Sequence, residues 1–131
     1  MKANNGKNNA DGSLRNGYIR EHFKDGSLCF EGEFSNGERI GEWKYYLTNG
    51  QLKAIGCYEN GLMTGEWKWF RENGQLMQVG TLDKDKKTGV WKRYHPNGAL
   101  YDEGMYIDDA KTGQWLIYDA DGNVTKTKKY K

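Results

Sequence analysis

The sequence predicts an all-β protein, a single-layer antiparallel β-meander built from five 24-residue β-hairpin repeats. Three observations predict this fold. Tryptophan recurs every 24 residues, Asn-Gly or Asp-Gly pairs recur at the same period, and the 131 residues include 18 glycines but a single proline. A constant period of about 20 to 50 residues marks a repeat architecture. Asn-Gly or Asp-Gly between strand-like runs is the strongest short hairpin signal.

Each repeat has the order Gly-x-Trp-x-x-aromatic, then Asn/Asp-Gly, then x-Leu, then Gly-x-Tyr. The first repeat departs from it with Ile19 and His22, and the last with Lys128 in place of glycine. We expect residues 1–16 to be a flexible tail and residues 17–131 to form one repeat domain, divided into 17–40, 41–64, 65–88, 89–112 and 113–131.

Both connections in a repeat read as turns, because neither is long enough for a crossover helix. A two-residue type I′ turn is predicted at each Asn-Gly or Asp-Gly pair. The expected strands are 18–23, 28–35, 42–48, 51–58, 66–72, 75–82, 90–96, 99–106, 114–118 and 124–130.

The predicted turn sets the register of each hairpin. With Asn49-Gly50 as the loop, Leu47 faces Leu52, Tyr45 faces Ala54, and Trp43 faces Gly56. An indole gains from a cross-strand neighbour without a side chain, and a bare glycine gains apolar cover. Valine at Gly56 or Gly80 is therefore expected to clash with Trp43 or Trp67, respectively.

Two rows of side chains are candidate partner-binding surfaces. The aromatic residues three after each tryptophan lie on the face opposite to it, flanked by lysines, and are Tyr46, Phe70, Tyr94 and Tyr118. On the tryptophan face, one strip does not repeat, and it contains Glu21, Tyr45, Trp69, Arg93 and Ile117 opposite Phe30, Ala54, Gln78, Asp102 and Lys126. Recognition can be encoded in such a strip, although sequence drift explains the variation equally well. The tryptophans themselves are interpreted as a structural ladder.

The unit GEWKYYLTNGQLKAIGCYENGLMTG resembles the MORN-repeat variant, and is similar to the YwqK-type family of bacterial antitoxins. The resemblance covers residues 17–131. It implies a rod of β-hairpin repeats with a role in interaction, and for the YwqK-type members the neutralisation of a toxin partner. We therefore expect a non-catalytic protein-binding module, with a membrane- or surface-associated scaffold as the alternative.

No motif indicates catalysis, and we expect no catalytic residue, cofactor or metal. His22 and Cys29 are predicted cross-strand neighbours that could begin a zinc site or a Cys–His pair. No third ligand or orienting group falls beside them in the predicted register, so a structural role is favoured. The charged segments Asp83–Lys87 and Asp108-Asp109 read as solvated turns, because a calcium loop needs more oxygen ligands.

The net charge is +2, and it lies in the ends of the chain: residues 1–16 and 119–131 each carry +2, while residues 17–118 carry −2. A nucleic-acid partner is not expected from this distribution. We expect a monomer or weak oligomer with a protein partner, a toxin being the candidate, and a cytoplasmic location, or an exported one if a leader preceded Met1. Membrane association is not favoured.

The last strand is predicted to cap the sheet. Lys126, Lys128 and Lys129 charge an edge that would otherwise pair with another chain. The stem of Lys128 is expected to lie across Trp115.

Overall fold

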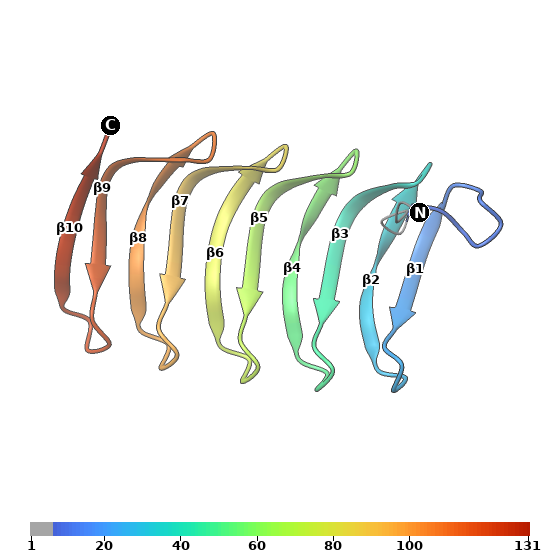
Figure 1. The fold of residues 1–131 in the computed structure, drawn as a ribbon, viewed down its shortest axis with the longest axis horizontal. Coiled ribbons are helices and arrows are strands. Elements are labelled where there is room, and N and C mark those ends of the chain that lie inside the picture. The colour runs from blue at the N-terminus through green and yellow to red at the C-terminus, as the bar shows by residue number, and fades with distance from the viewer. Residues whose placement is uncertain (1–6) are drawn as a thin grey trace.

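The computed structural model describes residues 7–131, in which ten strands form one open antiparallel sheet and no helix occurs (Figure 1). The strands follow one another in chain order, so the predicted single-layer meander is confirmed. They are β1 (Gly17–His22), β2 (Leu28–Ser35), β3 (Glu38–Tyr46), β4 (Leu52–Glu59), β5 (Leu62–Phe70), β6 (Leu76–Asp83), β7 (Lys86–Tyr94), β8 (Leu100–Ile107), β9 (Ala110–Tyr118) and β10 (Val124–Tyr130).

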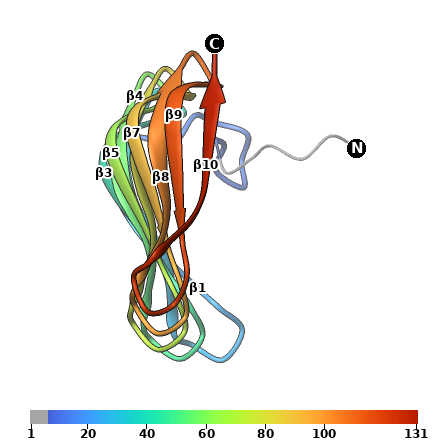
Figure 2. The ribbon, with the colours of Figure 1, turned by 90° about the vertical axis from the view of Figure 1, so that its left-hand side faces the viewer.

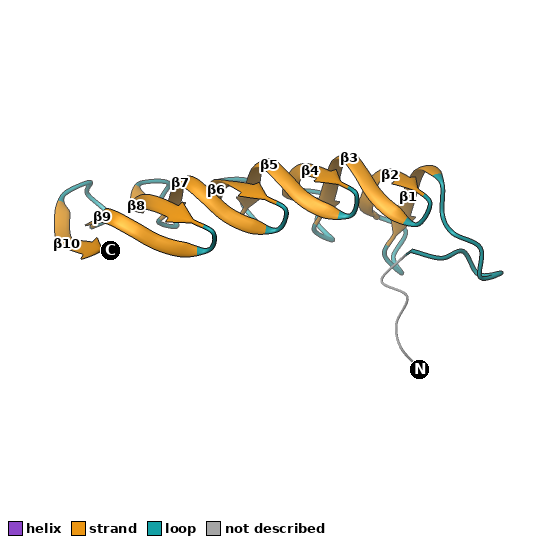
Figure 3. Cartoon of the chain, turned by 90° about the horizontal axis from the view of Figure 1, so that it is seen from above, coloured by secondary structure: helices purple, strands orange, loops and turns teal. Residues whose placement is uncertain are grey.

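The sheet is an elongated, twisted ribbon. Seen from above, the strand pairs advance in a row from β1 to β10 (Figure 3). Seen along that row, the strands superpose in one bowed layer that twists sharply near the lower turns (Figure 2). Twist of this kind is intrinsic to chains of L-residues. Each strand of the described chain therefore packs against its neighbours in the sheet and not against a second layer.

The two-residue type I′ turns are at the upper edge of the sheet in Figure 1, where β2, β4, β6 and β8 end. A type I′ turn needs positive φ at both central residues. Both positions meet this requirement in Asn36-Gly37, Asn60-Gly61, Lys84-Asp85 and Asp108-Asp109. The turns without glycine keep the same geometry: Asp tolerates the left-handed region, and Lys84 adopts it as well, with a φ of 50°.

The predicted type I′ turns at the lower edge are wrong. In the loop after β3, Gly50 takes a φ of 86°, whereas Asn49 is not among the positive-φ residues of the described chain. The Gly50 N–H donates to the Leu47 carbonyl at 2.9 Å, and Asn49 Oδ1 accepts from the Gln51 N–H at 2.9 Å. That side-chain contact favours a three-residue loop, with a type I turn followed by a left-handed glycine. Tyr46, not Leu47, therefore pairs with Leu52.

Four predicted strands start too late, because the repeat glycine lies inside a strand. β3 begins at Glu38 rather than at residue 42, and pairing with β2 is irregular between Glu31 and Glu33. Gly41 takes a φ of 67° there, and the equivalent residues Gly65, Gly89 and Gly113 also have positive φ, between 69° and 73°. The glycine forms a bulge, which bends a strand without ending it.

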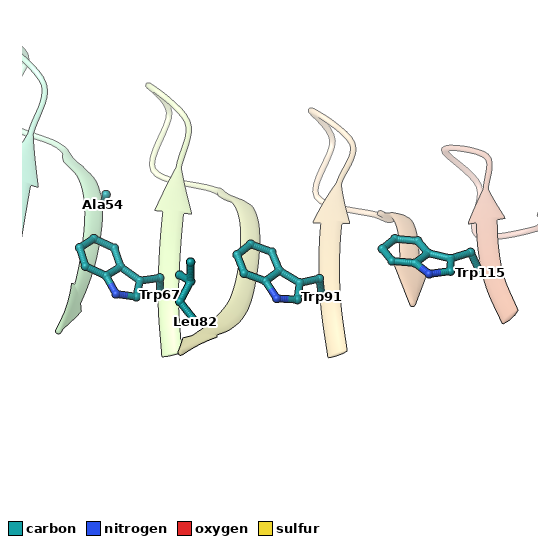
Figure 4. Close-up of a cluster of buried hydrophobic side chains, with 5 residues drawn as sticks. All are labelled: Ala54, Trp67, Leu82, Trp91 and Trp115. Carbon is teal, nitrogen blue, oxygen red and sulfur yellow. The ribbon is translucent and has the colours of Figure 1, made fainter. Parts of the chain in front are cut away.

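The tryptophans form the core of this single layer. Trp43 and Trp67 are 0% and 1% exposed, and Trp91 and Trp115 are each 3% exposed. Each ring points toward the preceding strand, as Figure 4 shows for Trp67, Trp91 and Trp115. A Cβ built on Gly56 would lie 2.0 Å from Trp67 Cδ2, and one on Gly32 2.1 Å from Trp43 Cδ2.

The predicted backbone pairing of Trp43 with Gly56 is confirmed. The predicted contact between them is wrong, because Trp43 covers Gly32 and Trp67 covers Gly56. The bulge also leaves carbonyl groups for the indole N–H: Trp43 Nε1 donates to the Glu33 and Ile40 oxygens, both at 3.1 Å. In Gly-x-Trp, the glycine thus allows the bulge, and the indole N–H of the tryptophan bonds to the carbonyl groups that the bulge leaves unpaired.

Part of the predicted tail contacts the sheet. Arg15 forms an ion pair with Glu21 at 3.0 Å, and its carbonyl accepts from the Gly37 N–H at 2.8 Å. Leu14 lies against Gly37, where a Cβ would come within 2.8 Å of its side chain. The expectation of a flexible segment at residues 1–6 concerns residues outside those described.

Candidate functional site

The non-repeating strip is one continuous row across the tryptophan face. Within hairpins, Tyr45 pairs with Ala54, Trp69 with Gln78, and Arg93 with Asp102, as predicted. Between hairpins, the register places each pair beside the next. The row therefore runs, strand by strand, through Glu21, Phe30, Tyr45, Ala54, Trp69, Gln78, Arg93, Asp102, Ile117 and Lys126.

The first half of the row is aromatic. Phe30 stacks on Trp43 with ring centroids 5.7 Å apart, and Trp69 lies 5.9 Å from Trp67 and 5.7 Å from Trp91. Tyr45 contacts the rings on both sides of it as well. Phe30, Tyr45 and Trp69 are half-buried, so each ring is held by its neighbours and still offers surface to solvent.

The second half of the row is polar. Arg93 binds Asp102 in two places, with Nε 3.1 Å from Oδ1 and Nη2 2.6 Å from Oδ2. Asp102 is 3% exposed, whereas the Arg93 side chain is 49% exposed. The hydrogen bonds to Asp102 raise the pKa of Arg93 above its ordinary value. The buried carboxylate thus fixes a guanidinium at the surface of the sheet.

Cations cover three of the tryptophan rings, a feature that the sequence interpretation missed. Arg39 lies 5.1 Å from the Trp43 ring, Lys87 5.0 Å from Trp91, and Lys111 4.7 Å from Trp115. Each stands four residues before its tryptophan, a position that holds a cation in three repeats and Met63 in the fourth, and this was the signal. The predicted contact of Lys128 with Trp115 is wrong, because that ring points to the preceding strand, over Gly104, and Lys111 covers it.

The column Tyr46, Phe70, Tyr94 and Tyr118 is half-buried and lies on the face opposite to the strip. The Tyr46 hydroxyl donates to Glu31 Oε2 at 2.6 Å, and the Tyr118 hydroxyl to Glu103 Oε2 at 2.5 Å. Burial first, and then this hydrogen bond, raises the pKa of Tyr46 to about 12. Two of the four rings are therefore tied to the preceding repeat, and the column does not join the strip in one site.

The predicted juxtaposition of His22 and Cys29 is wrong. His22 pairs with Leu28, because the register shifts between Glu21 and His22. No cluster of three metal-ligating side chains occurs in residues 7–131. The acidic turns hold the backbone: Asp85 Oδ1 accepts from the Met63 N–H at 2.6 Å, and Asp109 Oδ1 from the Lys87 N–H at 2.7 Å.

A cavity of about 450 Å³ adjoins the polar half of the strip. Sequence reasoning missed it, because its walls come from three strands and two loops. It is lined by Arg71, Met77, Gln78, Arg93, Tyr94, His95, Pro96 and Tyr101.

These features define a protein of β-hairpin repeats whose side chains vary along one face. The model of the MORN repeat variant matches residues 39–60, 63–84 and 87–108, just over half of the chain. The chain belongs to the MORN repeat variant family, and repeats of this kind commonly bind proteins or membranes. No curated protein matches the chain. Among the described residues, no helix is long and apolar enough to span a membrane.

Proposed function

We propose that this chain is a non-catalytic protein-binding module whose partner docks on the strip at Tyr45, Trp69 and Arg93. One observation carries the proposal. The strip places different side chains at the same position of successive repeats, in one unbroken row on a common backbone. Tyrosine, tryptophan and arginine are also the residues most enriched at interface hot spots.

The strip is preorganised for docking. Tyr45 and Trp69 are each wedged between neighbouring tryptophans, and Arg93 is held by Asp102. Ordering a side chain at an interface costs about 0.5 to 1.5 kcal/mol. Side chains that are already held avoid much of that cost. The column on the opposite face, Tyr46, Phe70, Tyr94 and Tyr118, is the second candidate surface.

The finer proposal is that the partner is a toxin and that this chain acts as its antitoxin or immunity protein in the cytoplasm. The resemblance of the repeat unit to the YwqK-type family supports it. Neutralisation would then require no chemistry from this protein, since occupying the toxin surface suffices.

The test is co-expression with the product of the adjacent gene. We expect rescue of growth and a complex on size exclusion. The double variant Tyr45→Ala/Trp69→Ala should lose both. The matched control is Lys44→Ala/Lys68→Ala, which alters the neighbouring residues of the same two strands on the opposite face. A complex that survives the strip variant but not the lysine variant would move the interface to the other face.

A membrane scaffold predicts a different result. Such a protein would float with vesicles containing anionic lipid, and its binding would weaken with salt. Flotation of the wild-type chain without any partner, together with no effect of Trp69→Ala on the co-expression assay, would overturn the protein-binding proposal.

A further inference from the structure

We propose that the cavity beside the strip binds a carboxylate of the partner protein. The carboxylate belongs to an acidic peptide segment and stands at the end of an aliphatic side chain, as in glutamate. This inference rests on the proposed function and names the chemistry that the partner presents there. It starts from the composition of the cavity: two arginines and no acidic residue are among its lining side chains.

The arginines meet here because of where the repeat places them. Arg71 directly follows β5, at the position that Leu47 occupies in the preceding repeat. Arg93 lies at the strip position that holds Tyr45 and Trp69 in preceding repeats. The two cations are on neighbouring hairpins and line one cavity, in a chain whose residues 17–118 carry −2.

Arg71 is held with a donor to spare. Its Nη2 donates to the Tyr94 carbonyl at 2.8 Å, which fixes the guanidinium against the next repeat. Its Nε is buried and has no hydrogen-bond partner. An unpaired buried donor costs about 1 to 3 kcal/mol, and more when it is charged. That nitrogen is closed to solvent, so a ligand would instead meet the other N–H donors of the Arg71 side chain, which lines the cavity.

Arg93 is held in the same way. Its two hydrogen bonds to Asp102 use two of the five N–H donors of a guanidinium. The remaining donors belong to a side chain that is about half exposed at 49%. The Tyr101 ring, 5.1 Å from the Arg93 Cζ, steadies it from another side. Both guanidinium groups are thus ordered before any ligand arrives.

The charge of the site suits a monoanion. Asp102 neutralises one guanidinium, which leaves one positive charge to be balanced. A carboxylate supplies one negative charge and two oxygens that match the planar guanidinium fork. A phosphate dianion would leave negative charge in excess.

The walls indicate what carries the carboxylate. Met77, Tyr94, Pro96 and Tyr101 supply apolar and aromatic surface around the two cations. A free small carboxylate would leave that surface uncovered, whereas a glutamate on a peptide brings an aliphatic stem and neighbouring side chains. Gln78 and Arg93 line the cavity and also belong to the strip, so one partner segment can contact both.

The experiment is an NMR titration of the full chain with a blocked pentapeptide Gly-Leu-Glu-Leu-Gly. Its counterpart with glutamine, sodium acetate and inorganic phosphate are titrated in parallel. We expect the glutamate peptide to shift the amides of Arg71, Tyr94, His95 and Tyr101, and to bind at least about tenfold more tightly than the glutamine peptide. A charge-assisted hydrogen bond contributes about 1.5 to 3 kcal/mol, and about 1.4 kcal/mol is tenfold.

Arg71→Gln should abolish the preference for glutamate, whereas Lys68→Gln, an exposed cation outside the cavity, should preserve it. Arg93→Gln is made together with Asp102→Asn, so that no buried carboxylate is left unpaired. This pair should also weaken binding at least about tenfold.

Equal binding of the two peptides, or tighter binding of phosphate or acetate than of the glutamate peptide, overturns the inference. If the glutamate peptide does not bind, although the strip variant still loses the partner protein, the carboxylate site alone is rejected. If the glutamate peptide binds but the co-expression test yields no complex with a protein partner, the proposed function alone is rejected.

Discussion

The two halves of the strip stabilise the same backbone in different ways. In the aromatic half, Tyr45 and Trp69 fill the space between successive tryptophans with ring contacts. In the polar half, the space between Trp91 and Trp115 holds Arg93 and Asp102, and a void of about 10 Å³ remains beside them.

The difference shows which positions of the repeat carry the fold. Replacing a ring by an ion pair leaves the register unchanged, since Trp69↔Gln78 and Arg93↔Asp102 are equivalent pairs. The Trp–Gly contact is retained in both halves. The bulge and its tryptophan thus maintain the sheet, while the strip is free to change its chemistry.

The largest expected effect comes from filling a glycine under a tryptophan. Gly56→Val should destabilise the chain by about 3 kcal/mol or more, the upper end of overpacking costs, because Trp67 has no room to move. Gly104→Val in the polar half should cost only about 0.2 kcal/mol less, since the void beside its Trp115 cover is about 10 Å³ and the added Cβ would meet the indole just as closely. Urea unfolding measures both.

The matched control is Lys128→Val, at the glycine position of the last repeat. Lys128 pairs with Trp115, but no tryptophan follows it in the sequence. Its effect should be within about 0.5 kcal/mol. If Lys128→Val and Gly56→Val lower the free energy of unfolding equally, the indole of the following repeat is not the cause.

Breaking the ion pair should have the next largest effect. Arg93→Ala leaves the Asp102 carboxylate buried without a cation, at a cost of about 2 kcal/mol after allowance for the exposed arginine. Arg93→Gln/Asp102→Asn should recover at least half of that loss. Denaturant midpoints that are the same for the single and double variants would contradict this account.

Acid should lower the stability of the fold through the contacts of Glu31 in the first two repeats. The Tyr18 hydroxyl donates to Glu31 at 2.6 Å, and this bond, followed by that from Tyr46, holds the pKa of Glu31 below 4.5. Because the folded pKa is lowered, the contribution is present above pH 4.5 and is lost as pH falls through the folded value.

Glu31→Gln should therefore cost about 1 kcal/mol at pH 7 and flatten the fall in melting temperature below pH 4.5. Thermal melts from pH 3 to pH 7 test this. Glu103→Gln, whose glutamate accepts one tyrosine hydroxyl, is the comparison in the polar half. An unchanged acid profile in Glu31→Gln would contradict the assignment.

The smallest effect on stability is expected at β10. Lys126→Thr/Lys128→Thr/Lys129→Thr should change the free energy of unfolding by less than about 0.5 kcal/mol, because all three side chains are exposed. It should nevertheless promote oligomers, since β10 pairs with β9 alone and its outer edge is open. Light scattering at low salt compares the variant with the parent. If the variant is as monodisperse as the parent, the three lysines do not cap the sheet.

Much of the fold could be predicted because its signals are local. The Trp43↔Gly56 and Tyr45↔Ala54 pairs were correct although the turn type was not. The three-residue loop and the irregularity between Tyr45 and Tyr46 compensate for each other in the register. The upper turns were harder, because Lys84-Asp85 adopts positive φ without the glycine that signals it.

The candidate site was predictable only in part. Membership of the strip follows from alternation along each strand, so Tyr45, Trp69 and Arg93 could be placed on one face. The cavity could not, because Arg71 reaches it by bonding to the carbonyl of Tyr94 in the next repeat. No periodicity in the sequence reports such a contact.

The sequence by itself determined the repeat, the order of the strands and the face on which each strip residue lies, because turn residues and a period of two act over a few positions. Only the tertiary structure decided that each indole covers the glycine of the preceding strand, and that two arginines converge beside Tyr101. The first contact depends on the direction that a bulge gives to a side chain, as at Trp67, and the second on a hydrogen bond from Arg71 to the next repeat.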